Sequence, residues 1–333
     1  MQKGIDVLAV GDVVIDAFIK LKDARVHCTI NDEECEICMR WGDKIPFESA
    51  TVVPAVGNSA NAAVAASRLG LSSALRAYVG EDIYAQDCLA ALIRDNVDTT
   101  YVERQANKHT NYHYVLWFEG QRTILVKHET FDYAAPVLPT PPAWVYLTSL
   151  SENSLPYHMA LMQMLKKWPQ TKLAFQPGTF QIKFGKEALA DVYKYTHIFF
   201  ANKEEAEHIL GLGAGTDIQE LLQGIRGLGP KVVVITDDVR GAYALDELEN
   251  TWFVPRYPDP RPPYEVTGAG DAFASSVVSA LALGLPLHQA LLWGPANASS
   301  VIQEIGAQKG LLTRVQLEEK LKNPPSEYAL QKL

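Results

Sequence analysis

Several features that mark particular protein classes are absent from this sequence. No apolar run approaches the roughly 20 residues that a membrane-spanning helix needs, and residues 1–6 lack the long apolar segment of a signal peptide. Cysteine is also rare, with four in 333 residues. We therefore expect a cytoplasmic protein that has no membrane partner and keeps its thiols reduced.

Positive charge is scarce as well. Lysine and arginine number 30 against 39 aspartates and glutamates, which gives a net charge of -9. Proteins that bind nucleic acid usually present a basic face, so this balance argues against a nucleic-acid partner. It does not exclude an anionic small substrate, which needs only local positive potential.

The four cysteines include one short motif. Cys35 and Cys38 form a C-x-x-C, and His27 and Cys28 stand just upstream. Three thiols and an imidazole could bind zinc, but the second C-x-x-C of common zinc sites is missing and His27 adjoins Cys28. We therefore favour plain packing over a zinc site or a redox pair.

Short apolar segments alternate with helical patterns along most of the chain. Strands buried on both faces have this character, and the alternation predicts a doubly wound, mainly parallel α/β sheet flanked by helices. The expected strands are residues 6–10, 75–79, 144–147, 172–175, 197–200 and 231–235. The expected helices are residues 61–69, 84–95, 154–167, 203–210, 218–228, 272–283 and 287–305.

Several polar residues and one glycine directly follow these strands. Ligands of doubly wound sheets bind beyond the carboxyl ends of the strands, so residues at these positions are candidates for one shared crevice. They are Asp12, Gly80, Gln176, Asn202 and Thr236.

Two segments interrupt the alternation. Residues 17–55 contain no clear long helix, and residues 108–128 have the pattern of a hairpin that turns at Glu119-Gly120. Together they could form a small sheet over the crevice. We therefore divide the chain into an α/β core of residues 1–16, 56–107 and 129–333 and a β lid of residues 17–55 and 108–128.

The stretch of residues 267–273 carries the clearest chemical signal. Gly268 and Gly270 leave the backbone bare where a helix begins, and the first amides of a helix can hold an anion such as a phosphate. Asp271 at the same turn is positioned to take a proton beside that anion. A tight turn with Asp271 as a helix cap explains the same residues.

Together with six other runs, this stretch resembles the ribokinase-like, or PfkB, family of carbohydrate kinases. The runs follow the family order over almost the whole chain: residues 11–16, 57–63, 80–82, 120–123, 202–205, 236–242 and 267–273. Departures from the family pattern are Val56, Ala85, Asp238 and Glu265. The last two bear on nucleotide affinity and on a monovalent-cation site.

The resemblance implies an ATP-dependent kinase that phosphorylates a hydroxyl of a sugar or nucleoside. It makes Asp271 the catalytic base and the turn Gly268-Ala269-Gly270 the anion hole, with Glu205 helping to hold Mg²⁺ through water. A monovalent cation such as K⁺ is a further implied cofactor. The residues that it implies around the nucleotide are Asn202, Thr236, Asp238, Gly241, Thr267 and Asn297.

The resemblance also implies a set of residues around the acceptor. These are Asp12, Asp16, Gly57, Asn58, Asn61 and Arg122. Some of the implied ligand residues have a structural explanation that competes with the functional one. Asn61 and Asn202 could each cap a helix, Glu205 could complete a capping box with Asn202, and Asn297 could be a packed polar residue.

The proposed lid segments are rich in histidine and aromatic residues. Solvated strand positions explain His27, His109, His113 and His128 more simply than metal binding does. Lid sheets of the resembled family often pair between subunits, so we expect a homodimer. The side chains that would suit such an interface, or would instead pack inward, are Tyr112, Tyr114, Trp117 and Phe118.

Two alternative functions stay open. A sugar-phosphate kinase of the same family would need cations near the acceptor, for which Arg122, Lys108, Lys127 and Lys183 are candidates. A non-catalytic sensor of a sugar or nucleotide on this fold would have no need of Asp271. A dinucleotide oxidoreductase is disfavoured because the first strand is followed by Gly11-Asp12-Val13-Val14 and not by G-x-G-x-x-G.

Overall fold

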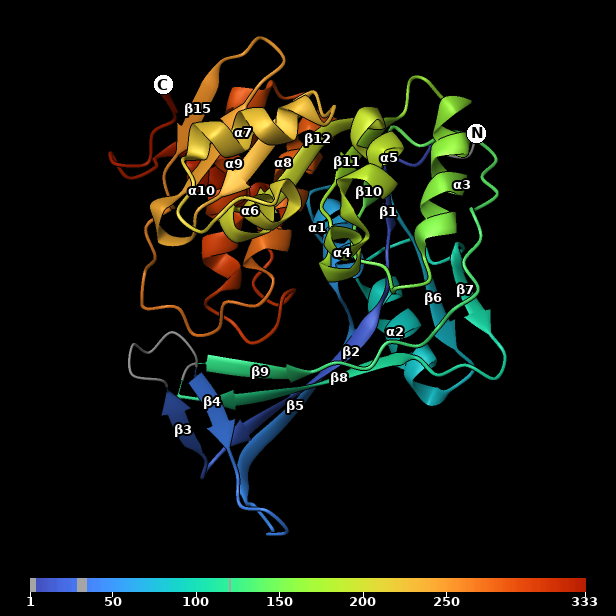
Figure 1. Ribbon diagram of the computed structural model, residues 1–333, viewed down its shortest axis with the longest axis vertical. Helices are drawn as coiled ribbons and strands as arrows, with labels where there is room; N and C mark the ends of the chain where they lie inside the picture. The colour runs from blue at the N-terminus through green and yellow to red at the C-terminus, as the bar shows by residue number, and fades with distance from the viewer. Residues whose placement is uncertain (1–3, 29–34, 120) are drawn as a thin grey trace.

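The computed structural model describes residues 4–28, 35–119 and 121–333. Within these ranges ten strands form one large sheet in the order β16-β15-β14-β13-β12-β11-β10-β1-β6-β7 (Figure 1). Neighbouring strands from β7 to β13 run parallel, whereas β14, β15 and β16 add an antiparallel edge. The strand bounds are β1 Val7–Val10, β6 Ser73–Gly80, β7 Val102–Gln105, β10 Trp144–Leu147, β11 Lys172–Phe175, β12 Thr196–Asn202, β13 Val232–Thr236, β14 Ala242–Leu245, β15 Thr251–Val254 and β16 Gln331–Lys332.

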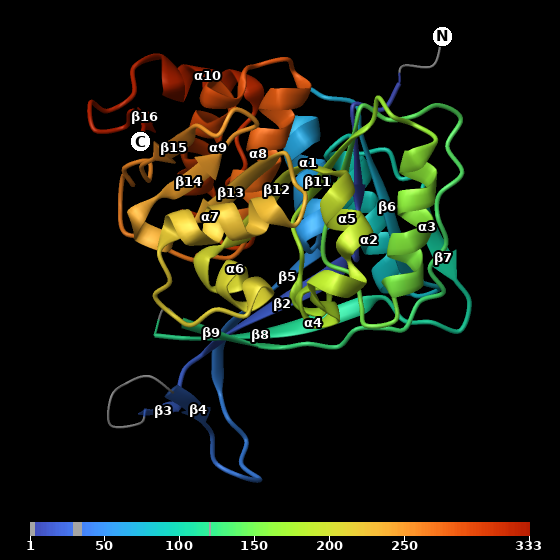
Figure 2. The same cartoon turned by 45° about the horizontal axis from the view of Figure 1, so that its top comes forward.

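Helices cover both faces of this sheet because its strands are apolar on both. In β1, Val7 and Ala9 pack with helices α1, α2, α8 and α9, while Leu8 and Val10 pack with α3, α5, α6 and α7. Figures 1 and 2 show the sheet between these two helical layers. The helix bounds are α1 Asn58–Arg68, α2 Ile83–Arg94, α3 Leu155–Lys166, α4 Thr179–Ala188, α5 Ala190–Tyr195, α6 Lys203–Leu210, α7 Ile218–Gly227, α8 Ala269–Ala282, α9 Leu287–Val301 and α10 Arg314–Lys322.

This architecture confirms the expected doubly wound α/β class. Strands β10 and β11 and helix α6 have the expected bounds, whereas α8 begins at Ala269, three residues before the apolar run that predicted it. The sequence pattern missed the antiparallel edge, since β14 to β16 are short and lie close to turns. None of the helices in the described ranges is long and apolar enough to cross a membrane.

A second sheet has four strands in the order β5-β2-β8-β9, and we call it the small sheet. Strands β2 and β8 pair in parallel, and β5 and β9 pair antiparallel to them at the edges. Figure 1 shows it extending from the lower side of the core, with the β3–β4 hairpin at its far end. The bounds are β2 Val14–Leu21, β3 Arg25–Cys28, β4 Cys35–Cys38, β5 Phe47–Val56, β8 Asn111–Phe118 and β9 Gln121–Leu125.

The small sheet extends beyond the first of the two segments that predicted it, at both ends of that segment. Strand β2 begins at Val14 and β5 continues to Val56, so residues 14–16, which we had assigned to the core, start the sheet. Consequently Asp12 belongs to the end of a core strand, whereas Asp16 belongs to the small sheet.

The β3–β4 hairpin contains three of the four cysteines. Antiparallel pairing places Cys28 opposite Cys35, and the two form a disulfide. Exposed Cys38 and buried Cys88 are free thiols. The expectation of fully reduced thiols is therefore wrong for Cys28 and Cys35. The C-x-x-C spacing drew Cys35 together with Cys38, whereas its partner across the hairpin is Cys28.

Candidate active site

A buried carboxylate lies where α8 begins. Asp271 is 7% exposed. Its Oδ1 accepts a hydrogen bond from Asn58 Nδ2 at 2.8 Å and one from Gln176 Nε2 at 3.3 Å, while its Oδ2 accepts one from Asn61 Nδ2 at 2.8 Å. Burial raises the pKa of Asp271, and the three amide donors oppose that rise.

The amides that hold Asp271 are themselves held by other side chains. Gln176 Oε1 accepts a hydrogen bond from the Tyr146 hydroxyl, and Asn61 Oδ1 accepts one from Gln308 Nε2 at 3.0 Å. These contacts turn the NH₂ groups of Gln176 and Asn61 toward the carboxylate. The carboxylate is thus fixed by side chains from α1 and from the segment after β11.

The turn before Asp271 requires glycine at its first position. Gly268 has φ 77°, in the left-handed region, and a β-carbon there would overlap Ala307. Gly270 has open space beside it, with only Gln176 Nε2 within 4 Å of the position a β-carbon would take. In the first turn of α8 the Ala269 amide donates to the Val266 carbonyl at 3.3 Å, whereas the amides of Gly270 and Asp271 have no carbonyl partner within their own helix. They therefore provide a cradle for an anion next to Asp271.

A cavity of about 390 Å³ opens in front of this turn. It is lined by residues at the carboxyl ends of four strands of the large sheet, as the sequence pattern predicted: Asp12 and Gln176 follow their strands, and Asn202 and Thr236 end theirs. Gly80 does not line it, because its backbone packs against residues 108–110 and its amide donates to Thr110 Oγ1 at 3.2 Å. Other lining residues that the sequence predicted are Asp16, Gly57, Asn58, Asn61, Arg122, Glu205, Thr267, Gly268, Ala269, Gly270 and Asp271.

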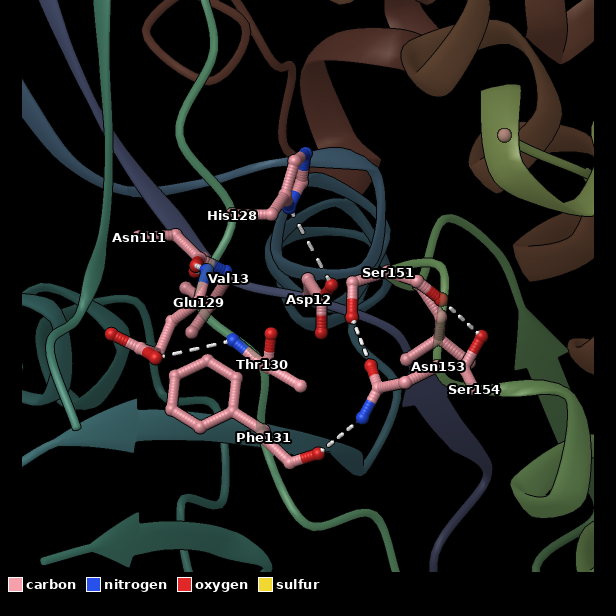
Figure 3. A network of polar contacts seen from close by, with 12 residues as sticks. Asp12, Val13, Asn111, His128, Glu129, Thr130, Phe131, Ser151, Asn153 and Ser154 are labelled. Carbon is pink, nitrogen blue, oxygen red and sulfur yellow. Dashed lines mark hydrogen bonds and ion pairs between the residues drawn. The ribbon is translucent and has the colours of Figure 1, made fainter. Parts of the chain in front are cut away.

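Two aspartates line the end of the cavity nearest the small sheet. Asp12 is 3% exposed; its Oδ1 accepts a hydrogen bond from the Tyr133 hydroxyl at 2.8 Å, and its Oδ2 lies 3.7 Å from His128 Nδ1 (Figure 3). Asp16 is 9% exposed, and its Oδ1 lies 3.4 Å from His113 Nδ1.

Burial dominates the ionisation of this end of the cavity. It raises the pKa of Asp12 to about 7, although hydrogen bonds from Tyr133 and the Ser151 backbone favour the charged form. It also lowers the pKa of His128 to about 4, with a smaller contribution from His113 nearby. At neutral pH, His128 is therefore uncharged and Asp12 exchanges a proton with solvent or ligand at low cost.

Sequence reasoning misplaced two histidines. His113 and His128 line the cavity and are 13% and 19% exposed, so they do not occupy solvated strand positions as we expected. His109, by contrast, is 75% exposed. The inward position of His113 could have been predicted from the alternation of side chains along β8. His113 shares a face with buried Val115 and with Trp117, which packs against Tyr264.

Asn202 and Glu205 combine a structural and a cavity-lining role. The Asn202 side chain accepts a hydrogen bond from the Glu205 amide at 2.8 Å, and Glu205 Oε2 accepts one from the Asn202 amide at 2.9 Å. This capping box starts α6 and leaves both residues on the cavity wall. Burial raises the pKa of Glu205, and the charge of Asp271 adds to the rise.

A second cavity of about 840 Å³ lies beside the first. Asp238 and Gly241 line it, and Asn202, Thr236, Ala269 and Gly270 line both cavities. Asp238 is exposed in a short 3-10 turn. The neighbouring residue Asp237 is buried, and its carboxylate is paired with Arg240, whose Nε lies 2.8 Å from Asp237 Oδ2.

Arg122 lines the first cavity, but its guanidinium is already paired. It donates to Glu265 Oε1, which also accepts hydrogen bonds from the amide and hydroxyl of Thr267. Glu265 Oε2 accepts one from the Gly306 amide at 3.3 Å. The prediction that Arg122 contacts the acceptor took no account of this partner and stays a prediction. The buried Glu265 links β9 of the small sheet to the turn before α8.

Asn297 does not reach either cavity. Its side chain is fully buried between α8 and α9, where Nδ2 donates to Ser276 Oγ at 2.8 Å and Oδ1 accepts from the Leu312 amide at 2.9 Å. The packed-residue interpretation fits this position, because the hydrogen-bonding groups of Asn297 serve the core, and contact with a nucleotide stays a prediction.

The comparison with known proteins decides the family. The pattern of the pfkB family of carbohydrate kinases matches residues 35–314. The chain belongs to this family. This pfkB-family chain is 26% identical over 299 residues to the ribokinase of Bacillus subtilis, covering 84% of this chain and 92% of the relative. It is also 28% identical over 160 residues to the nucleoside kinase of Methanocaldococcus jannaschii, covering 47% of this chain and 49% of the relative.

Solved structures of other pfkB-type proteins share the fold. The ribokinase of Arabidopsis thaliana complexed with ribose and ATP superposes with a TM-score of 0.79 at 18% identity, over 96% of this chain and 100% of that one. The nucleoside kinase of Methanocaldococcus jannaschii gives a TM-score of 0.77 at 19% identity, over 96% and 99% of the two chains. At these identities the likeness concerns the fold.

The buried Asp12 carboxylate of this pfkB-family protein should make its stability depend on pH. Because the folded pKa of about 7 lies above the ordinary value of 3.8, the stability that Asp12 contributes is full below about pH 4 and is lost as pH rises through about 7. The free energy of unfolding of the wild type, minus that of Asp12→Asn, should fall by up to about 4 kcal/mol over this range. Urea unfolding at several pH values measures the difference, with Asp23→Asn on the surface as control. A difference that stays flat from about pH 4 to about pH 8 would contradict the assignment.

The placement of Asn297 gives a second prediction. Asn297→Ala should lower the free energy of unfolding by roughly 1–3 kcal/mol, because it leaves the Leu312 amide and Ser276 without their partner. The KM for ATP should not change. Unfolding curves and steady-state kinetics check both points, with exposed Asn323→Ala as control. A raised KM without a loss of stability would return Asn297 to the nucleotide site.

Proposed function

We propose that this protein transfers the γ-phosphoryl group of ATP to a hydroxyl of a sugar or nucleoside. The observation that carries the proposal is Asp271, a buried carboxylate at the first turn of a helix whose first residues line the same cavity. A base beside an anion cradle is what phosphoryl transfer to a hydroxyl requires. Membership of the pfkB family supports the same reaction.

The two cavities suit the two substrates of this reaction. They share a wall formed by Asn202 and Thr236, which end strands β12 and β13, and by Ala269 and Gly270 at the start of α8. Pockets for small ligands usually have volumes of about 300–1,000 Å³, a range that includes both. We assign the nucleotide to the larger cavity and the acceptor to the smaller one, so that they meet at Gly270 and Asp271.

Similar proteins support ATP as the phosphoryl donor. A ribokinase of the same fold was solved with ribose and ATP, and another, from Cryptococcus neoformans, with ADP. In the present chain we assign nucleotide contact to Asn202, Thr236, Asp238, Gly241 and Thr267, of which all line one or both cavities. Asp238 is exposed and can point away from the phosphates.

Mg²⁺ fits the donor set of the first cavity through Glu205. Mg²⁺ usually takes only one or two carboxylates and completes its shell with water and substrate phosphates. Glu205 keeps one carboxylate oxygen outside the capping box. When bound, Mg²⁺ would offset the charge of the phosphates. A K⁺ ion at Glu265 does not fit, because both oxygens of that carboxylate already accept hydrogen bonds from Arg122, Thr267 and Gly306.

The proton of the acceptor hydroxyl goes to Asp271 in this proposal. Its raised pKa brings the carboxylate closer to the operating pH, where a general base works best. The amides of Asn58, Asn61 and Gln176 hold it in one orientation. The hydroxyl oxygen then attacks the γ-phosphorus, while the first-turn amides of α8 stabilise charge on the phosphoryl oxygens.

We further propose that the small sheet is a lid and that its outer face pairs with a second copy. Val52, Ala17, Tyr114 and Leu125 lie opposite one another across the four strands, so they share one face. This face is opposite the one that carries Asp16 and His113 toward the cavity. Val52, Tyr114 and Leu125 are each about half exposed, an apolar row that a homodimer would bury.

The base assignment predicts the behaviour of Asp271 variants. Asp271→Asn and Asp271→Ala should lower kcat by roughly 10²–10⁴-fold, since a positioned base contributes about that much, while the Kd for ATP changes little. Coupled detection of ADP release and calorimetric titration with ATP measure the two quantities. Asp87→Asn, exposed on α2, is the matched control. Full turnover by either Asp271 variant would contradict the assignment, and a wild type that binds sugar without turnover would favour the sensor.

The dimer proposal predicts the effect of charge on the outer face. Tyr114→Glu and Leu125→Glu should each shift a dimer toward monomer, because a buried carboxylate there would lack a partner. Sedimentation velocity at several protein concentrations reports the shift. Val137→Glu adds the same charge at an exposed position outside the sheet and should leave the dimer intact. A wild type that stays monomeric at all concentrations would overturn this assignment.

A further inference from the structure

Two carboxylate–imidazole pairs form the acceptor end of the first cavity. Asp12 lies 3.7 Å from His128 Nδ1, and Asp16 lies 3.4 Å from His113 Nδ1. The two imidazole rings lie edge to face with centroids 5.2 Å apart, so the pairs are neighbours. All four side chains line the same cavity as Asp271.

The fold holds both histidines in place. His113 pairs in register with Asp16 across the parallel strands β8 and β2. His128 starts a segment that is anchored on both sides, because the Glu129 amide donates to Oδ1 of Asn111 in β8 at 2.7 Å and Asn153 Nδ2 donates to the Phe131 carbonyl at 2.8 Å. Figure 3 shows His128 directed at Asp12 from this anchored segment.

These pairs have unused hydrogen-bonding capacity. Among the described residues, Asp16 Oδ1, His113 Nε2 and His128 Nδ1 are buried without a hydrogen-bond partner. Leaving such atoms unpaired is costly in a folded protein, and all three belong to residues on the cavity wall. A hydroxyl can donate to a carboxylate and accept from an imidazole N–H at once. Hydroxyls of a bound acceptor are therefore suitable partners for each pair.

The side chains at the acceptor end of the cavity favour an acceptor without a phosphate. The acidic residues Asp12, Asp16, Glu205 and Asp271 line the cavity wall, and among the residues that the structure describes the one lysine or arginine there is Arg122, which is paired with Glu265. The lysines that could have recognised a phosphate are elsewhere. Lys108 donates to the Thr130 carbonyl, Lys183 lies over the Phe180 ring, and neither these two nor Lys127 lines the cavity.

We propose that His113 and His128, each paired with an aspartate, select an uncharged, hydroxyl-rich acceptor and reject its phosphate esters. This inference rests on the proposed kinase function and adds the substrate class. Each imidazole contacts one acceptor hydroxyl, and its partner carboxylate accepts a hydrogen bond from the same or the adjacent hydroxyl. The proposal thus favours a free sugar or nucleoside over the sugar-phosphate alternative.

The test uses the full-length protein with ribose, fructose and adenosine, each beside its monophosphate ester, at saturating ATP and Mg²⁺. The wild type should turn over at least one unphosphorylated compound and prefer it to its ester. His113→Ala and His128→Ala should each raise the KM for that acceptor about tenfold, as expected for a lost hydrogen bond, without changing the KM for ATP. His113→Gln, which keeps a donor and an acceptor, should restore part of the affinity.

Controls separate this inference from folding and from the proposed function. His109→Ala, a histidine outside the cavity, should leave the acceptor KM unchanged, and thermal unfolding checks that each variant is folded. Preference for a phosphate ester would overturn the inference, and so would an unchanged acceptor KM in both folded histidine variants. In either case the proposed kinase function stands if Asp271→Asn is inactive. The absence of turnover with every compound would overturn the function and the inference with it.

Discussion

The site depends on one constraint, namely that a carboxylate is kept buried at the start of a helix. Asp271 has lost most of its contact with water, and burial alone would favour its protonated form. Amide donors from Asn58, Asn61 and Gln176 offset that cost. They come from different parts of the chain, so the core must be assembled before the carboxylate is in place.

A second buried carboxylate, Glu265, connects the two sheets. It accepts hydrogen bonds from Arg122 of the small sheet, from Thr267 before α8 and from Gly306. Glu265 therefore links the turn that forms the proposed anion hole to the small sheet. Movement of the small sheet would be transmitted directly to Thr267 and Gly268, which gives a lid a physical route to the reacting groups.

Local patterns predicted much of the fold and part of the site. Buried strands such as β10 and the glycine turn at Gly268 have signals within a few residues, since burial and a positive φ leave a mark on composition. The antiparallel edge strands and the Cys28–Cys35 bond depend on partners distant in the chain or across a turn. Their short segments gave no periodicity to detect.

Hydrogen-bond partners distant in the sequence also explain where the observed site differs from the sequence-based expectation. Arg122 and Asn297 have side chains that suit a ligand, but Glu265 and the Leu312 amide satisfy them instead. His113 and His128 looked solvated because strand alternation was applied to the hairpin without knowing which face met the core. A sequence shows which groups can make hydrogen bonds, whereas the pairing is decided by packing between distant segments.

The most direct measurement of the central claim is a crystal structure with acceptor and a non-hydrolysable ATP analogue. The account predicts an acceptor hydroxyl within about 3.2 Å of an Asp271 carboxylate oxygen, and the terminal phosphate of the analogue on the first-turn amides of α8. An acceptor bound away from Asp271, with the carboxylate still enclosed by Asn58, Asn61 and Gln176, would contradict it.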